Sequence, residues 1–232
     1  MKQFSGTLAL VGSGEYLPPM RPVDEWLLSQ LREPPRVACL PTAAGQEGPE
    51  RIGYWARMGV EHFTQLGAEA EAVGIIDRAT AEDEACAARI RTANFVYLSG
   101  GKPEYLHNTL KGTRAWQAIE GVLNSGGVVA GCSAGAMIFG AHIPSFPTLW
   151  PLKPAFGYLP EVVIMPHFDE FSVMFATALK TVAGRATLVG IEGNTSLVCR
   201  AEGYTVRGSG GVTVWNARLK QRYISEESVP IV

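Results

Sequence analysis

The sequence predicts an α/β fold, a three-layer sandwich in which a mainly parallel sheet lies between two layers of helices. Short apolar runs alternate with amphipathic segments through the first two thirds of the chain, and this alternation is typical of a parallel sheet covered by helices. Most of the apolar runs are continuous, as expected for strands buried on both faces. The last third carries short strands between glycine turns, which predicts a C-terminal antiparallel extension.

The composition indicates a single domain over residues 1–232. Hydrophobic residues make up 47% and charged residues 18% of the chain, enough apolar material for a sizeable core. The net charge of −2, without a basic run, argues against a nucleic-acid partner. No stretch has the length of a signal peptide or a membrane span, so we expect no membrane partner and a cytoplasmic protein. Four single cysteines and no cluster with ligand spacing predict neither a metal nor a cofactor.

The expected strands are apolar runs that end at glycine, proline or polar residues. In chain order they are Thr7–Val11, Val37–Leu40, Ala70–Ile76, Phe95–Leu98, Val128–Ala130, Val162–Met165, Thr187–Ile191, Ser196–Cys199, Tyr204–Val206 and Val212–Trp215. The expected helices have apolar residues at three- and four-residue spacing. They are Val23–Leu31, Pro49–Leu66, Ala81–Ile90, Glu104–Leu110, Trp116–Leu123, Ala134–Phe139 and Phe171–Val182.

Four short segments follow the expected strands and fall at one edge of the sheet. They are Gly12-Ser13-Gly14, Pro41-Thr42-Ala43, Gly100-Gly101 and Gly131–Gly135. Ligands of open α/β sheets bind beyond the carboxyl ends of the strands, so one crevice is expected to collect all four. The proline-rich loop Gly140–Pro160 is either a lid or substrate wall, or a rigid surface arm.

The pattern Gly131-x-Ser133-x-Gly135 between a strand and a helix is typical of a nucleophile elbow. Such a turn has glycine on both sides because side chains there would collide with backbone. It also brings the next backbone N–H, that of Ala134, to a helix N-terminus, where an oxyanion can be held. The alternative is an ordinary glycine-rich turn with a buried serine. Cys132 lies one place away from the nucleophile position.

A serine nucleophile needs an imidazole that accepts its proton. His62 and His107 lie in helical segments and His142 lies in the proline-rich loop. His167 directly follows an apolar strand at the edge expected for the serine, between Pro166 and Phe168. We therefore expect His167 to be the general base.

Six short motifs, which occur in a fixed order between residues 7 and 215, resemble those of a known protein family. They are Gly12-Ser13-Gly14-Glu15, Leu98-Ser99-Gly100-Gly101, Gly131–Ala136, Pro166-His167-Phe168, Gly190–Thr195 and Gly208–Val212. Together they resemble the peptidase family that contains aspartyl dipeptidase (peptidase E) and cyanophycinase. The resemblance implies a fold like that of class I glutamine amidotransferases, which is flavodoxin-like, and a serine hydrolase that cleaves peptide bonds next to aspartate or β-aspartyl linkages.

The resemblance also implies residue roles. Ser133 is the implied nucleophile, His167 the implied base, and the N–H groups of Gly101 and Ala134 the implied oxyanion hole. Glu15, Gly100 and Lys102 are expected to bind substrate, a small peptide or amide. A homodimer is left open.

The sequence departs from the family pattern at two places. Relatives tend to carry an acidic residue at the position of Gly193, whereas here Glu192 lies one residue earlier. One step along a strand reverses the direction of a side chain, so the acid of the triad is Glu192, or Asp169 after it, or absent. Lys102 stands where relatives usually have Asn or Asp, and it either reads a substrate carboxylate or points to solvent. The alternative functions are a hydrolase of another small amide or ester and a silent ligand-binding relative.

Overall fold

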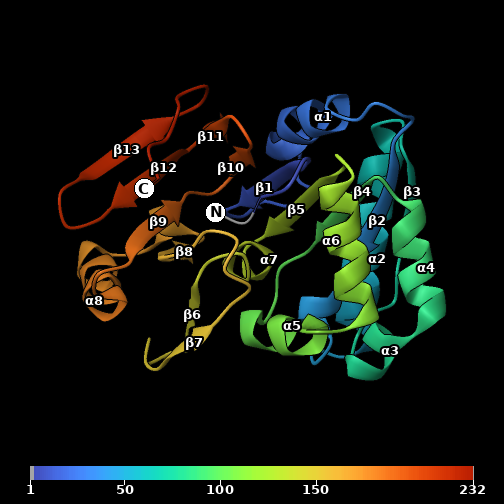
Figure 1. The fold of residues 1–232 in the computed structure, drawn as a ribbon, viewed down its shortest axis with the longest axis horizontal. Coiled ribbons are helices and arrows are strands. Elements are labelled where there is room, and N and C mark those ends of the chain that lie inside the picture. The colour runs from blue at the N-terminus through green and yellow to red at the C-terminus, as the bar shows by residue number, and fades with distance from the viewer. Residues whose placement is uncertain (1–2, 232) are drawn as a thin grey trace.

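The computed structural model describes residues 3–231 and contains a seven-stranded main sheet (Figure 1). Its strands are β1 (Thr7–Val11), β2 (Arg36–Leu40), β3 (Glu69–Ala72), β4 (Phe95–Leu98), β5 (Val128–Cys132), β10 (Thr195–Arg200) and β11 (Gly203–Gly208). The strand order is β11-β10-β1-β5-β4-β2-β3. The pairs among β1 to β5 are parallel, while β10 pairs antiparallel with β1 and β11 with β10. The predicted fold class is confirmed.

Helices cover both faces of this sheet, because successive side chains of each strand point to opposite faces. The helices are α1 (Arg21–Ser29), α2 (Pro49–Gln65), α3 (Arg78–Glu82), α4 (Glu84–Thr92), α5 (Pro103–Leu110), α6 (Arg114–Asn124), α7 (Ala134–Met137) and α8 (Val173–Ala183). Helices α1 and α2 bury Leu27 and Phe63 against one face. Helices α3 to α7 bury residues such as Ile90, Leu106 and Ile119 against the other.

A second sheet of four strands lies beside the first and was not foreseen as a separate unit (Figure 1). Its order is β13-β12-β9-β8, and the strands are β8 (Val162–Met165), β9 (Thr187–Ile191), β12 (Gly211–Trp215) and β13 (Lys220–Ile224). One face packs into the main core through residues such as Ile164 and Val189. The other face is covered by α8, with Leu179 against Val163. Strand β13 was missed because its residues are mostly charged and polar.

Two expected elements differ in the structure. The expected helix Ala81–Ile90 is two helices, because Asp83 has an extended conformation and its carboxylate caps the second helix at Ala85 and Cys86. The expected strand Ala70–Ile76 ends at Ala72, opposite Cys39 near the end of β2.

The proline-rich segment folds as a hairpin of β6 (His142–Pro144) and β7 (Leu152–Pro154). Lys153 forms an ion pair with Glu104 of α5, and Leu149 is buried in the cluster under α8. The hairpin is therefore fixed to the body of the protein through β7 and through the loop that connects its strands.

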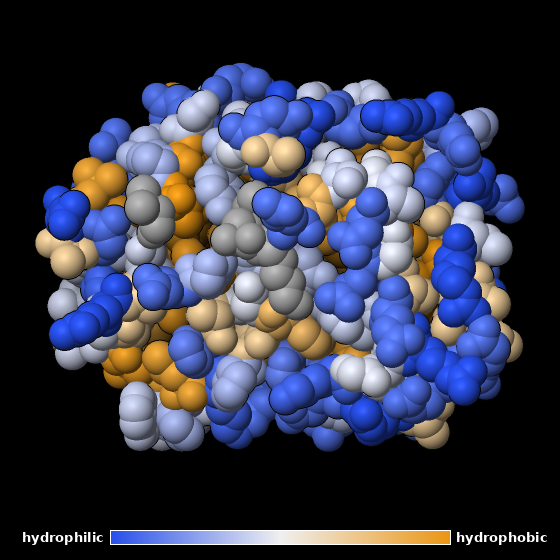
Figure 2. Space-filling view, viewed as in Figure 1, coloured by the Kyte–Doolittle hydropathy of each residue, from blue (hydrophilic) through white to orange (hydrophobic). Residues whose placement is uncertain are grey.

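Four of the exposed large apolar residues lie on the hairpin and α8, namely Phe146, Trp150, Val173 and Met174. Figure 2 shows hydrophobic surface at the lower left, where Figure 1 places these elements.

The three remaining helical turns are of the 3₁₀ type. They are η1 (Pro18–Met20), η2 (Thr42–Ala44) and η3 (Phe168–Glu170). Across residues 3–231, none of the helices combines the length and apolar character needed to cross a bilayer.

Candidate active site

Ser133 lies at the turn between β5 and α7 in a backbone conformation that non-glycine residues seldom adopt. Its φ is 51° and its ψ is −109°. The turn is held in place because the Ser133 N–H donates to the carbonyl of Val11 at 2.9 Å, and the N–H of Ala136 donates to the Ser133 carbonyl at 3.0 Å. A strained residue that its surroundings fix in this way is a candidate for function.

The two flanking glycines are required by close backbone packing. A Cβ on Gly131 would lie 2.3 Å from the carbonyl oxygen of Gly135, and a Cβ on Gly135 would lie 2.5 Å from that of Leu98. Both positions therefore exclude any side chain, which is the physical reason for the spacing seen in the sequence.

The structure brings three of the four carboxyl-end segments into contact, those after β2, β4 and β5, while Gly12 and Gly14 pack against Glu192 and Asn194. A Cβ on Gly100, after β4, would be 3.4 Å from the Cβ of Ser133. Gly101 has a φ of 143° and packs against the backbone of Ala43, after β2. The Lys102 N–H donates to the Ala43 carbonyl at 2.9 Å.

His167 reaches Ser133 from the second sheet. It follows β8 and Pro166, has a left-handed conformation with φ 55° and ψ 32°, and places Nε2 3.0 Å from Ser133 Oγ. The strand β8 and the turn after it thus put an imidazole within hydrogen-bond distance of the hydroxyl. This is the geometry that a general base needs.

The turn that carries His167 is anchored to the end of β9. The ring of Phe168 fills the space beside Gly190, where a Cβ would be only 2.2 Å from the ring. The carboxylate of Asp169 accepts the N–H of Gly193 at 2.8 Å. Asp169 therefore acts on the turn and not on the imidazole.

The acid that contacts His167 is Glu170. Its Oε1 lies 3.0 Å from His167 Nδ1, and its side chain is 63% exposed. The contact follows from the 3₁₀ turn, in which side chains three residues apart are eclipsed. Glu170 is not among the residues that the sequence motifs indicate. The signal that could have found it is the acidic residue three positions after the histidine.

Glu192 does not approach His167 in the structure. Its carboxylate forms two hydrogen bonds with Arg222 of β13 and accepts the N–H of Gly211 at 2.8 Å. Arg222 holds the pKa of the Glu192 carboxyl below its usual value of 4.5. The carboxylate is thus held by β12 and β13 and does not orient the imidazole.

Two backbone N–H groups near Ser133 are available to a ligand. Ala134 is the first residue of α7, and the first N–H groups of a helix have no partner within it. The N–H of Gly101 donates to no other group within residues 3–231. These are the two residues for which the family resemblance implies an oxyanion hole.

Glu15 and Cys132 lie beneath this surface. Glu15 is 9% exposed, and its carboxylate accepts hydrogen bonds from the Gly100 N–H at 3.0 Å and the Cys132 thiol at 2.9 Å. Its two oxygens thus face the protein, in contrast to the substrate contact expected from the sequence. Burial, reinforced by the nearby Glu15 charge, raises the pKa of the Cys132 thiol well above its usual value.

A cavity of about 590 Å³ opens beside Gly101 between α5 and the hairpin. Its lining residues include Lys102, Tyr105, Asn108 and Phe146. The Lys102 ammonium donates to the neutral side-chain amide of Gln46 at 3.2 Å. The cavity therefore contains a cation that no carboxylate neutralises within the described part of the chain.

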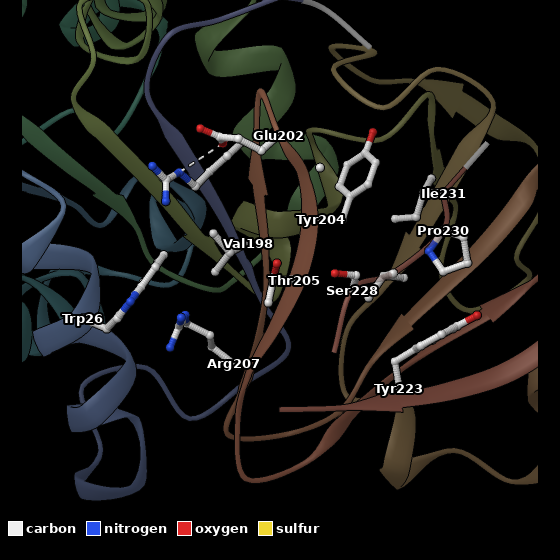
Figure 3. Close-up of a pocket in the computed structure, with 13 residues that line it drawn as sticks. Trp26, Val198, Glu202, Tyr204, Thr205, Arg207, Tyr223, Ser228, Pro230 and Ile231 are labelled. Carbon is white, nitrogen blue, oxygen red and sulfur yellow. Dashed lines mark ion pairs between the residues drawn. The ribbon is translucent and has the colours of Figure 1, made fainter. Parts of the chain in front are cut away.

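A larger cavity, of about 910 Å³, contains none of the predicted site residues. Figure 3 shows Trp26 and Arg207 on one side of it, and Tyr223 and Pro230 on the other. The Arg207 guanidinium lies 3.8 Å from the centre of the Trp26 ring and is ion-paired with Glu226.

The other histidines have different surroundings in the described chain. His62 is hydrogen-bonded to the buried Asp24 at 2.8 Å, His107 packs against the ring of Phe156, and His142 lies on β6 of the hairpin. No group of three or more His, Cys, Asp or Glu residues suited to a metal occurs between residues 3 and 231.

Comparison with known proteins defines the class. The sequence model of peptidase family S51 matches residues 8–207, most of the chain, and the protein is a serine-type peptidase. The chain belongs to peptidase family S51. No curated protein matches it at a significant level.

Two solved structures are similar. A peptidase from an acI-B1 Actinobacterium is 33% identical, with a TM-score of 0.89 over 97% of this chain and 96% of that one. A putative peptidase E protein from Listeria monocytogenes EGD-e is 18% identical, with a TM-score of 0.63 over 88% of this chain and 99% of that one. The second likeness concerns the fold alone.

Proposed function

We propose that this peptidase hydrolyses small peptides next to an aspartate, with Ser133 as nucleophile, His167 as general base and Glu170 as the residue that orients the imidazole. The observation that carries the proposal is the distance of 3.0 Å between Ser133 Oγ and His167 Nε2, two atoms supplied by different sheets. The strained conformation of Ser133 supports it, since such strain is concentrated at active sites.

The first half of the reaction forms an acyl-enzyme. Ser133 Oγ attacks the carbonyl carbon of the scissile bond as its proton passes to His167 Nε2. The negative charge that develops on the carbonyl oxygen is stabilised by the N–H groups of Gly101 and Ala134. When the intermediate collapses, the C–N bond breaks and the imidazolium gives its proton to the leaving amine.

The second half releases the acid product. A water molecule gives a proton to His167 as its oxygen attacks the ester of Ser133, and the same N–H groups stabilise the new oxyanion. Collapse of this intermediate breaks the ester bond, and the proton returns to Ser133 Oγ. Throughout, Glu170 favours the tautomer in which Nδ1 carries the hydrogen and Nε2 is free to accept.

The substrate preference is supported by the cavity beside Gly101. Lys102 supplies a cation to this cavity, and its ammonium donates a hydrogen bond to the neutral Gln46 amide. An aspartate carboxylate that replaced this amide would add an ionic attraction to the hydrogen bond of the ammonium. The cavity volume of about 590 Å³ falls in the range of small-molecule sites, roughly 300–1,000 Å³.

Labelling with a fluorophosphonate tests the nucleophile. The probe is expected to modify Ser133 alone, and Ser133→Ala should abolish labelling without changing the melting temperature by more than a few degrees. Cys132→Ala is the matched control and should still be labelled. Labelling that survives Ser133→Ala would contradict the assignment. Cleavage of a simple ester without cleavage of an Asp-Leu dipeptide would favour the second candidate, a hydrolase of other small esters or amides.

A further inference from the structure

Glu15 bridges the two backbone segments that would perform the reaction. Its carboxylate lies after β1, between the ends of β4 and β5. One oxygen accepts the N–H of Gly100 and the other accepts the thiol of Cys132. Gly100 immediately precedes the oxyanion donor Gly101, and Cys132 immediately precedes Ser133. A single buried side chain therefore connects both halves of the site.

The Glu15 carboxylate holds Gly100 in close contact with Ser133. A Cβ on Gly100 would lie 2.8 Å from Glu15 Oε1 and 3.4 Å from the Cβ of Ser133. Gly100 is therefore confined between the carboxylate and the serine. Gly101 is confined as well, because a Cβ there would be 2.5 Å from the backbone of Ala43. Displacement of Gly100 would thus change the position of the Gly101 N–H relative to Ser133 Oγ.

The thiol end of the bridge is a hydrogen-bond donor. Burial of Cys132, together with the charge of Glu15, keeps its pKa well above the usual range, so the sulfur retains its proton at neutral pH. A protonated thiol can donate to the carboxylate but is a poor nucleophile. Cys132 therefore belongs to the support of the site.

We infer that Glu15 is a positioning residue that fixes the distance between the Ser133 hydroxyl and the Gly101 N–H through its hydrogen bonds to Gly100 and Cys132. This inference rests on the proposed function, in which that hydroxyl attacks and that N–H binds the oxyanion. Glu15 itself contacts neither the substrate nor a reacting atom.

The inference predicts a change in kcat with little change in KM. The Gly101 N–H engages an oxyanion that exists only in the transition state, and loss of such an interaction lowers kcat and kcat/KM equally. Removal of one oxyanion-hole donor costs about 100- to 1,000-fold in kcat. Displacement of the donor without its removal should cost about 10- to 100-fold.

Two substitutions separate the hydrogen bonds from the shape of the side chain. Glu15→Met is similar in length and supplies no carboxylate oxygen, so we expect the full loss in kcat. Glu15→Gln keeps an oxygen for the Gly100 N–H and has an amide N–H that can donate to the Cys132 sulfur, a weak acceptor, so it should lose less than about fivefold. Asp24→Asn is the matched control, because Asp24 is another buried carboxylate, on the helix α1 that covers this face of the sheet, and among residues 3–231 its side chain hydrogen-bonds to His62 alone. Its kcat should be unchanged per folded molecule.

Binding of a peptide boronic acid gives a readout besides turnover. The boron forms a tetrahedral adduct with the serine, and its oxygen occupies the oxyanion position. Glu15→Met should weaken boronate binding by the same factor as it lowers kcat. Binding of the corresponding peptide with a plain carboxamide should not change, because that ligand forms no oxyanion.

The possible outcomes distinguish this inference from the proposed function. If the wild-type protein forms no boronate adduct, Ser133 is not the nucleophile and the proposed function fails. If the wild-type protein and Glu15→Met bind the boronate equally, only the inference about Glu15 fails. Equal losses in Glu15→Gln and Glu15→Met would also overturn it, since the acceptor for Gly100 would then be irrelevant. If Glu15→Met does not fold, the Cys132 variants provide the test. Cys132→Ala should then lower kcat about tenfold, and Cys132→Ser, which keeps a donor, should restore it. An unchanged kcat in Cys132→Ala would overturn the inference.

Discussion

Glu192 and Arg222 form a bidentate ion pair. Arg222 Nε lies 2.5 Å from one carboxylate oxygen of Glu192, and a terminal nitrogen of the same guanidinium lies 2.6 Å from the other. The pair joins the end of β9 to β13, and the same carboxylate accepts the N–H of Gly211 at the start of β12. This acidic residue therefore connects three strands of the second sheet.

Glu192→Gln is expected to affect stability more than activity. The Arg222 guanidinium is half exposed, so the pair should contribute about 1 kcal/mol, and the melting temperature should fall by about 2–4 °C at pH 7. The proposed function predicts a loss in kcat below about threefold. Steady-state kinetics on an Asp-Leu dipeptide measure it. A loss near the ten-thousandfold seen when a triad acid is replaced would identify Glu192 as the orienting acid.

The pH dependence of the same variant follows from the direction of the pKa shift. The pKa of Glu192 is lowered in the folded protein, mainly by its hydrogen bond to Arg222. The unfolded chain therefore binds a proton first as the pH falls. The stabilising effect is fully present above the usual value of 4.5 and is lost as the pH falls through the lower folded-state value. Melting curves of the two proteins should differ by a constant amount from pH 7 to 5 and converge below about pH 4.5.

Glu170→Gln should lower kcat by about tenfold. The carboxylate orients His167, but it is 63% exposed, and water screens it far more than the buried aspartate of a serine protease, whose loss costs roughly ten-thousandfold. The kcat of both proteins is measured at pH 7 and at two salt concentrations. The difference in kcat between the wild type and Glu170→Gln should become smaller as salt rises, because salt screens the exposed carboxylate. No change in kcat would mean that the imidazole is oriented without an acid.

His167→Ala should reduce turnover by several orders of magnitude and leave the melting temperature nearly unchanged. The imidazole is partly exposed and supports no buried core, whereas removal of a base disables the whole catalytic unit. His142→Ala is the matched control and should retain most of the activity. The reverse result would transfer the catalytic role to the hairpin.

Gly190→Ala tests the anchor of the histidine turn. The added methyl group would overlap the ring of Phe168 and should displace the turn by about 1 Å, a misplacement that costs on the order of 100-fold in rate. Gly53→Ala, in α2 with open space around it, is the control and should leave kcat unchanged. Equal activity in both variants would show that Phe168 does not set the position of His167.

Lys102→Met should raise KM for acidic substrates more than for neutral ones. Loss of a hydrogen bond to a charged group costs roughly 1.5–3 kcal/mol, which corresponds to about ten- to a hundredfold in specificity. The ratio of kcat/KM for Asp-Leu and Asn-Leu dipeptides in both proteins measures it. An unchanged ratio would show that another residue reads the carboxylate.

The sequence could predict the positions of Ser133 and His167 in the fold because each position depends on a local pattern. Gly131 and Gly135 frame Ser133 within five residues of sequence, although the second of them packs on Leu98 of another strand, and His167 lies two positions after the end of an apolar strand. The parallel strands β1 to β5 were predictable for the same reason, since their burial produces continuous apolar runs.

The remaining features depend on relationships that sequence periodicity does not contain. The contact between His167 and Glu170 arises from a left-handed residue followed by a 3₁₀ turn, and the preference of a histidine for this conformation is weak. An apolar run such as Thr187–Ile191 looks the same in either sheet, so the division into two sheets could not be inferred. The partner of Glu192 is on β13, a strand whose alternating charged residues give no apolar signal.

The origin of Ser133 and His167 in different sheets has a consequence for synthesis of the protein on the ribosome. Ser133 emerges before His167. Strand β10, which completes the main sheet by pairing with β1, emerges later still, and Arg222 last of these. A nascent chain therefore carries the serine well before the two sheets can close around it. Under the proposed mechanism, the peptidase becomes active only after β10 and the strand that carries Arg222 have been made.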